Sequence, residues 1–199
     1  MSLQNRVVII LVAMLALAIP LDRGAVSHEE EMNKRLQQEL SYYQQASVLS
    51  DLLFREGVPV NMKVVVTMLR EIDKNIIVFY PKGPFTRTDF IALGWLESEY
   101  RQYERGTHGE RGIFQIMPGE FRDFDIRKNY YNVDINTQMA FRVMDGKFQK
   151  HKDYKLAIMA YNGLVKTKNG KYSLKYWKSF EKRKVAVELV LNNISHDNP

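Results

Sequence analysis

The 199-residue chain contains no cysteine, which excludes structural disulfides, thiolate nucleophiles and thiolate metal sites. Its four histidines are scattered, and no pair has the spacing of metal ligands on a helix. We therefore expect neither a metal nor another cofactor. Apolar residues are abundant, with 45% hydrophobic and 12% aromatic, enough to bury a core. The composition predicts one folded domain with an appendage and excludes a disordered chain.

An uninterrupted apolar run extends from Val7 to Leu21, directly after a basic residue. Its length suits the apolar region of a secretory signal better than a full membrane span, and the Ala-x-Ala sequence ending at Ala18 resembles a cleavage site. Because Pro20 follows so closely, an uncleaved signal anchor stays open, and a buried core helix is the weaker alternative. We interpret residues 1–21 as a signal peptide or signal anchor.

Residues 22–84 are predicted to form a helical N-terminal arm. Ser27 and Glu30 have the spacing of a capping box, and the amphipathic pattern behind them ends at Gly57. This helix either packs on the following domain, which is slightly favoured, or forms a stalk or a partner-binding coiled segment. Its apolar stripe comprises Met32, Leu36, Leu40, Tyr43, Ala46, Leu49, Leu52 and Leu53.

A second helix is expected over residues 61–74, where apolar positions again recur at helical spacing. The next six residues, 75–80, are ambiguous. A Pro- and Gly-containing turn at residues 81–84 closes this region and sets a loose domain boundary.

A third helix should begin near Arg87, because Thr86 and Asp89 form a capping pair directly ahead of an apolar run. A helix that is apolar on nearly all sides belongs in a core, so Glu97 emerges from a hydrophobic wall. Loss of hydration there should raise the pKa of its carboxyl group. A raised pKa is what a general acid needs near neutral pH.

Three motifs follow one another in this part of the chain: Glu97-Ser98, then Gly-Glu-Arg-Gly-Ile-Phe-Gln-Ile-Met-Pro at residues 109–118, then Ala-Tyr-Asn at residues 160–162. In order and spacing they resemble the lytic transglycosylases with a soluble-lytic-transglycosylase, goose-type lysozyme-like domain. Gln115 lies 18 positions after Glu97, which is the separation expected of that family. The resemblance covers about half of the chain and implies an all-α or mainly α, lysozyme-like fold.

Two departures from the family pattern are visible. Family members often continue Glu-Ser with Gly-Phe-Asn-Pro, whereas this chain has Glu99 in place of the glycine and lacks the Asn-Pro turn. Glu110 stands between two glycines where a small residue is usual. It is either a solvated surface charge, which is favoured, or a second carboxylate that faces the cleft.

The resemblance implies cleavage of the β-1,4 bond between N-acetylmuramic acid and N-acetylglucosamine in peptidoglycan, giving 1,6-anhydro ends. Glu97 would be the catalytic acid and base, and Ser98 would orient it or the substrate's acetamido group. Gln115 and Asn162 would line the cleft, and Tyr161 would hydrogen-bond near the acid. From the residues alone, a loop-pinning hydrogen bond for Gln115 is as open as substrate contact. A core position is the usual one for a tyrosine such as Tyr161, and only the motif match favours a role in the site.

Further helices are predicted over residues 134–150 and 154–162, the second capped by Asp153 and ended by Gly163. Tyr176 and Trp177 are a weak match to a later aromatic position of the family.

Residues 150–184 carry a net charge of +9 within a chain of net +6. Solvated helix faces account for much of this charge, which also suits an anionic wall polymer.

Residues 85–199 are thus predicted to be a transglycosylase domain with a basic C-terminal helix, acting on peptidoglycan strands. A hydrolysing muramidase is the closest rival, and its second acid would be Glu110, Glu104 or Asp123. A non-catalytic wall-binding or assembly protein and a duplex-DNA binder are further rivals, although no nucleic-acid motif is present and no specific nucleic acid is expected.

We expect a periplasmic protein, or one anchored in the inner membrane and facing the wall, or a phage virion protein. The helix at residues 28–56 would serve an envelope-spanning or virion assembly.

Overall fold

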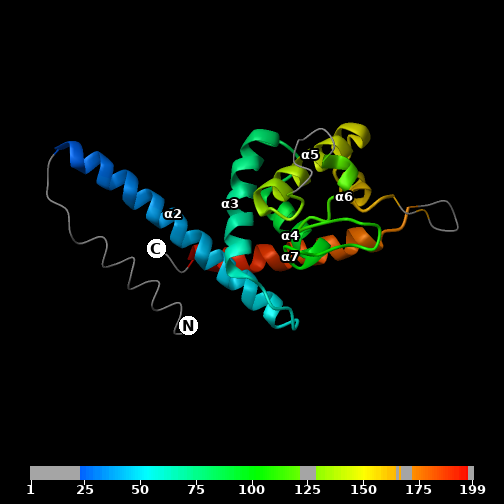
Figure 1. Ribbon diagram of the computed structural model, residues 1–199, viewed down its shortest axis with the longest axis horizontal. Helices are drawn as coiled ribbons and strands as arrows, with labels where there is room; N and C mark the ends of the chain where they lie inside the picture. The colour runs from blue at the N-terminus through cyan, green and yellow to red at the C-terminus, as the bar shows by residue number, and fades with distance from the viewer. Residues whose placement is uncertain (1–22, 122–128, 165, 167–171, 197–199) are drawn as a thin grey trace. The chain divides into compact units, whose positions relative to one another are not determined.

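The computed structural model describes residues 23–121, 129–164, 166 and 172–196 (Figure 1). The predicted signal peptide or anchor at residues 1–21 lies outside the described residues. Within the described ranges, no helix combines the length and the hydrophobicity needed to span a bilayer. The chain divides into two compact units between Gln44 and Gln45. Residues 45–84, which the sequence assigned to the N-terminal arm, fall in the larger unit, where the candidate site lies.

Helix α2 (Arg23–Phe54) is the predicted amphipathic helix, but its first residue differs from the predicted one. Because the helix already begins at Arg23, Ser27 lies inside it, and the capping box predicted there is wrong. The other end is as predicted. Gly57 follows the helix with a φ of +79°, a left-handed conformation that glycine adopts without strain.

Only part of the apolar stripe predicted for α2 is buried. Ala46, Leu49 and Leu53 are fully buried, whereas Met32 and Tyr43 are 46% and 42% exposed. The two alternatives for this helix, packing on the domain and a stalk or partner-binding segment, stay predictions. Helical spacing places residues on a common face but does not say over what length that face is covered.

Helix α3 (Met62–Phe79) confirms the helix predicted over residues 61–74 and extends it through the ambiguous segment. Asn61 is the N-cap, and its side chain accepts hydrogen bonds from the backbone N–H groups of Lys63 and Val64. The extension is stabilised at Asn75, a buried residue whose side chain donates to the Glu71 carbonyl at 2.8 Å. A buried helix face overrides the β-propensity of the valines in this segment.

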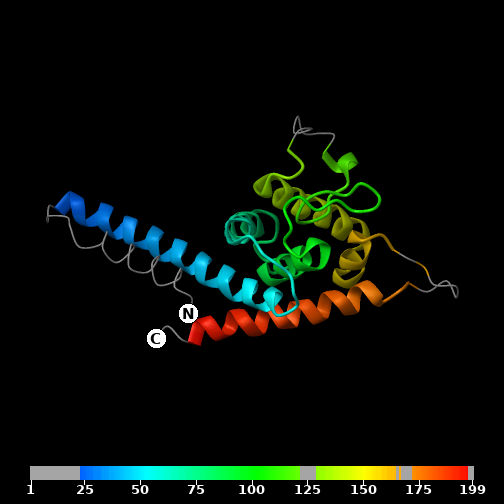
Figure 2. The ribbon, with the colours of Figure 1, turned by 60° about the horizontal axis from the view of Figure 1, so that its bottom comes forward.

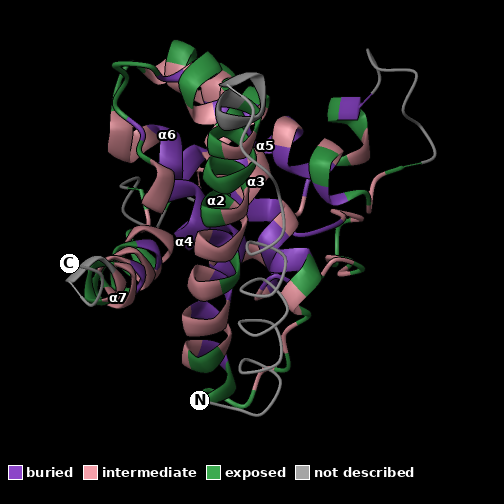
Figure 3. Ribbon diagram, turned by 90° about the vertical axis from the view of Figure 1, so that its left-hand side faces the viewer, coloured by how far each residue is buried: buried purple, intermediate pink, exposed green. Residues whose placement is uncertain are grey.

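Helix α4 (Arg87–Ser98) is central to the larger unit and is buried along most of its length (Figure 3). It packs against α3 and lies alongside α7 (Lys175–His196), as Figures 1 and 2 show. Around it stand a short 3-10 helix, η1 (Pro118–Phe121), and the helices α5 (Val133–His151) and α6 (Tyr154–Tyr161). Among the described residues, β structure is limited to isolated bridges. The expected all-α, lysozyme-like fold is confirmed.

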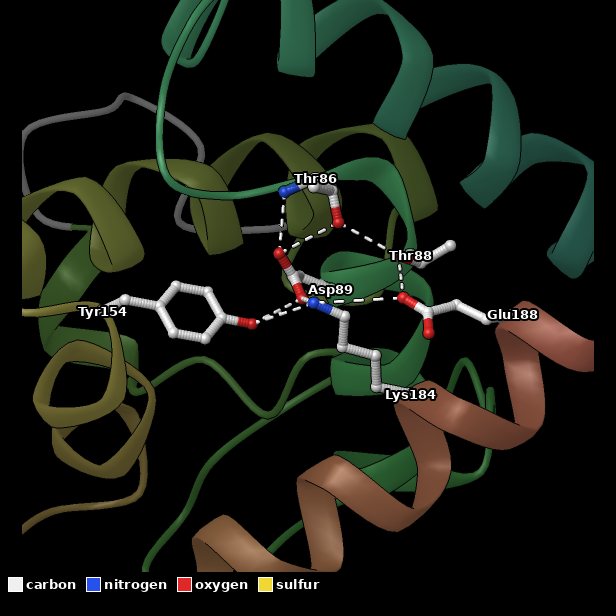
Figure 4. A network of polar contacts seen from close by, with 6 residues as sticks. All are labelled: Thr86, Thr88, Asp89, Tyr154, Lys184 and Glu188. Atoms are coloured by element: carbon white, nitrogen blue, oxygen red, sulfur yellow. Dashed lines mark hydrogen bonds and ion pairs between the residues drawn. The ribbon is translucent and has the colours of Figure 1, made fainter.

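The carboxylate of Asp89 joins three of these helices (Figure 4). Its Oδ2 atom accepts from the Thr86 backbone N–H at 2.7 Å, which is the predicted capping box at the start of α4. Its Oδ1 atom accepts from the Tyr154 hydroxyl of α6 and the Lys184 ammonium of α7, each at 2.7 Å. Asp89 is only 2% exposed, so its charge depends on these partners for stabilisation. The network sets the position of α7 against α4.

Replacing Asp89 by asparagine should destabilise the protein by about 2 kcal/mol, because Lys184, whose side chain is 26% exposed, would lose its nearer counter-ion and keep only Glu188 at 4.0 Å. Urea denaturation would measure the loss. The matched control is Glu31→Gln, which breaks the ion pair with Arg35, because both of these side chains are exposed, 61% and 73%. That pair should contribute less than about 0.5 kcal/mol. Equal losses in the two variants would contradict the structural role given to Asp89.

Candidate active site

Glu97 lies in the last turn of α4, just before the chain reverses direction. The reversal places two successive residues, Glu99 and Tyr100, in the left-handed region, with φ of +56° and +59°. Such values are unfavourable for residues other than glycine and persist where surrounding contacts impose them. Here Tyr100 is buried and its hydroxyl donates to the Ile91 carbonyl at 3.0 Å, which fixes the turn. Glu99 thus adopts the backbone conformation that the family's usual glycine would adopt with less strain.

The carboxyl group of Glu97 is largely removed from water and accepts a hydrogen bond from the Tyr176 hydroxyl. Burial raises its pKa from 4.5 to about 7, the hydrogen bond from Tyr176 opposes this rise, and the negative charge of Glu110 adds to it. The raised pKa is the one that the sequence predicted. At neutral pH the carboxyl group can therefore both donate and accept a proton.

Tyr176 reaches Glu97 from the first turn of α7, 79 residues further along the chain. Its own pKa is raised well above the usual value by burial and by the charge of Glu97, so it acts as a neutral donor. The sequence offered only a weak signal for this residue, its match to a late aromatic position of the family. No local pattern indicates that it meets Glu97.

Replacing Tyr176 by phenylalanine should raise the pKa of Glu97 further, because the lost hydrogen bond stabilises the carboxylate. Nuclear magnetic resonance titration of the labelled Glu97 carboxyl carbon would measure the change directly. Tyr172→Phe removes a hydroxyl from a tyrosine that is 40% exposed and should leave this titration where it is. An unchanged or lowered pKa in the first variant would contradict the assigned hydrogen bond.

Ser98 and Gln115, two predicted site residues, both hydrogen-bond to the backbone of the loop between Glu104 and Ile116. Ser98 is 2% exposed, and its hydroxyl donates to the Ile113 carbonyl at 2.7 Å. The Gln115 side-chain amide donates to the carbonyls of Gly112 at 2.8 Å and Glu104 at 3.2 Å. The contacts of Gln115 are those of the loop-pinning hydrogen bond that the sequence left open for this residue.

Asn136 of α5 holds the same loop, and the sequence did not single it out. Its Oδ1 atom accepts from the Phe114 N–H at 2.9 Å, and its amide donates to the carbonyls of Arg111 and Tyr130 at 2.9 and 3.0 Å. It is 1% exposed, so these bonds satisfy its polar atoms away from water. The sequence feature that could have indicated Asn136 is its position, as a polar residue, within the helix predicted over residues 134–150.

Tyr161 and Asn162 stand together at the end of α6 but point to different environments. The Tyr161 hydroxyl donates to the Phe114 carbonyl at 2.9 Å. Burial, and then the charge of Glu97, raise its pKa well above the usual value, which places it near the acid. Asn162 is exposed and lines a pocket.

This pocket has a volume of about 320 Å³ and lies between the ends of α4 and α6 and the start of α7. It adjoins Glu97 through Leu96 and Tyr176, although Glu97 is not itself part of the lining. The wall is formed by Leu96, Met159, Asn162, Gly163, Ser173, Lys175, Tyr176 and Ser179.

The three acids considered as a second catalytic group have different positions. The Glu110 side chain is 25% exposed, accepts the His108 N–H at 3.0 Å, and is close enough to raise the pKa of Glu97. Glu104 is ion-paired at 3.1 Å with a neighbouring arginine. Asp123 lies outside the described residues. In the described part of the chain, no three acidic or histidine side chains are grouped as metal ligands.

Comparison with known protein families gives a match. The model of the family described as Transglycosylase SLT domain matches residues 86–184, from the N-cap of α4 to Lys184 on α7. No curated protein and no solved structure matches the chain. The matched segment contains Glu97, Gln115, Tyr161 and the hydrogen-bond partner Tyr176. The chain therefore belongs, through residues 86–184, to the transglycosylase SLT domain family.

Proposed function

We propose that this protein is a peptidoglycan lytic transglycosylase that cleaves the β-1,4 bond between N-acetylmuramic acid and N-acetylglucosamine. Its products would carry 1,6-anhydro ends. Membership of the SLT family supports peptidoglycan as the substrate and glycosidic-bond cleavage as the reaction. The observation that carries the proposal is a single carboxyl group, Glu97, with a pKa of about 7 at the end of a buried helix.

The proposed reaction uses this carboxyl group twice. Glu97 first donates its proton to the glycosidic oxygen while the bond from that oxygen to C1 of the muramic acid breaks. The resulting carboxylate then takes the proton of the C6 hydroxyl of the same sugar, and the C6 oxygen attacks C1. The substrate's acetamido group stabilises the positive charge between the two steps. No water is consumed, and the second carboxylate of most glycosidases is not required.

The other residues are proposed to position the acid and the substrate. Tyr176 orients the Glu97 carboxyl by its hydrogen bond. Ser98 and Gln115 hold the loop beside it through buried backbone contacts, so their contribution to substrate binding is made through the shape of that loop. Tyr161 supports the same loop from α6, and Asn162 is exposed at the pocket, where a side-chain amide can contact sugar hydroxyls.

A hydrolysing muramidase is the second candidate, and the position of Glu110 favours it. A carboxylate that lies near Glu97 and is not fully buried can activate a water molecule, as the base of an inverting glycosidase does. The Nδ1 atom of His108 also lies 3.3 Å from the Glu110 carboxylate. Export or membrane anchoring through residues 1–21 stays a prediction under either mechanism.

The test is a digest of purified peptidoglycan with the full chain, with products identified by mass spectrometry. Anhydro ends, which are one water lighter than hydrolysed ends, are the expected result. Reducing ends would replace the proposal with the muramidase and direct attention to Glu110. An undigested wall that sediments together with the protein would reject both reactions in favour of a binding or assembly role.

A further inference from the structure

The pocket beside Tyr176 contains one cation, Lys175, and no carboxylate among its lining side chains. Among the described residues, no acidic side chain forms an ion pair with the Lys175 ammonium. Two other lysines of this region are engaged, since Lys184 pairs with Asp89 and Lys155 lies 5.2 Å from the centre of the Trp177 ring. The charge of Lys175 is therefore available to a ligand.

The remaining wall of the pocket suits an anion with hydrogen-bonding oxygens. Asn162, Ser173 and Ser179 supply side-chain donors, while Leu96 and Met159 form apolar walls. Lys175 is an exposed residue, so its attraction for a bound anion acts partly through water and should weaken as the salt concentration rises. The net charge of +9 on residues 150–184 adds a longer-range attraction of the same sign.

The position of the pocket connects it to the reacting bond. Tyr176 lines the pocket and also donates to Glu97, so a ligand held there lies next to the acid. In peptidoglycan, the groups that bear carboxylates project from the muramic acid, which is the sugar attacked at C1 in the proposed reaction. The positive charge of Lys175 in the pocket is therefore opposite in sign to the carboxylates that the muramic acid carries.

We propose that this pocket binds a carboxylate carried by the side chain of the muramic acid, with Lys175 as its counter-ion. The carboxylate comes from the peptide stem, or from the lactyl group where the stem has been removed. The inference rests on the proposed function, because it names the part of the peptidoglycan that the same site recognises. Lys175 thereby determines specificity and takes no part in proton transfer.

The test measures binding, so that it does not depend on cleavage. The full chain carrying Glu97→Gln is titrated by calorimetry with soluble peptidoglycan fragments, either untreated or with their carboxylates chemically converted to amides. The dissociation constant should be about tenfold weaker for the amidated fragments, because one charge-assisted contact is lost. Lys175→Met should abolish this preference, and Lys175→Arg should retain it. Fragments without stems, which expose the lactyl carboxylate, distinguish the two sources.

The matched control is Lys178→Met, which removes the same charge from an exposed α7 position that does not line the pocket. It should keep the preference for untreated fragments. If the Lys175→Met form keeps that preference too, or if no form binds either fragment, the inference is overturned. If the wild-type chain yields no cleavage products while the Glu97→Gln form binds as expected, the proposed function alone is overturned.

Discussion

Replacing Glu97 by glutamine is expected to reduce peptidoglycan cleavage about a thousandfold or more, because the amide can neither donate the proton nor accept the second one. The substitution keeps the size of the side chain and leaves a partner for the Tyr176 hydroxyl. Release of soluble fragments from purified wall would measure it. The matched control is Glu110→Gln. If the protein is a transglycosylase, this variant should still release products with anhydro ends. A Glu97→Gln form that retains wild-type turnover would reject the assignment of the acid.

The same substitution should change stability in a pH-dependent way. The pKa of Glu97 is raised in the folded state, from 4.5 to about 7, so the native protein binds a proton that the unfolded chain has released. The native state is therefore favoured by this group below about pH 4, and that contribution is lost as the pH rises through 7. Glutamine carries no charge, so it does not lose this contribution. The Glu97→Gln form should therefore become more stable relative to the wild type as the pH rises from about 4 to about 7.

The gain has an upper bound of roughly 3 kcal/mol, from the size of the pKa shift. Urea denaturation of both forms at about pH 4 and about pH 8 would measure it, with Glu99→Gln as a control that removes a partly exposed acid two residues away. A stability difference between wild type and the Glu97→Gln form that is the same at both pH values would show that the carboxyl group titrates normally.

Replacing Gly112 by alanine is expected to destabilise the protein by about 3 kcal/mol, combining backbone strain with overpacking. Its φ is +80°, and an added Cβ would stand 2.5 Å from the side-chain nitrogen of Asn136. That amide cannot move without breaking its bonds to the loop at Phe114, Arg111 and Tyr130. Cleavage should be lost with the loop, and thermal denaturation would measure the stability.

Two other glycines separate the causes of this effect. Gly109 has a φ of +94° and open space around its added Cβ, so alanine there should cost only the strain, about 1 kcal/mol. Gly146 lies inside α5, also with open space, and alanine there should be stabilising by up to about 1 kcal/mol. A Gly112→Ala form no less stable than the Gly109→Ala form would contradict the tight contact with Asn136.

Local chemistry explains which parts of this structure could be predicted. The start of α4 depends on Thr86 and Asp89, three residues apart, and the end of α6 depends on Gly163, so both were found from neighbouring residues. Ser27 shows the limit of such signals. It has the spacing of a cap, yet α2 continues through it, because a capping pair is also an ordinary pair of helix residues when the chain before it is helical.

The sequence by itself determined the all-α class, the helices that begin near Arg87 and at Tyr154, and the direction of the pKa shift of Glu97, because all of these depend on spacing within one or two helical turns. Only the tertiary structure decided that Tyr176 meets Glu97, that Asn136 holds the loop of Gly112, and that Lys184 pairs with Asp89. These partners lie 22 to 95 residues apart. Periodicity places a side chain on the buried face of its helix, but the packing of helices selects the group that it meets there.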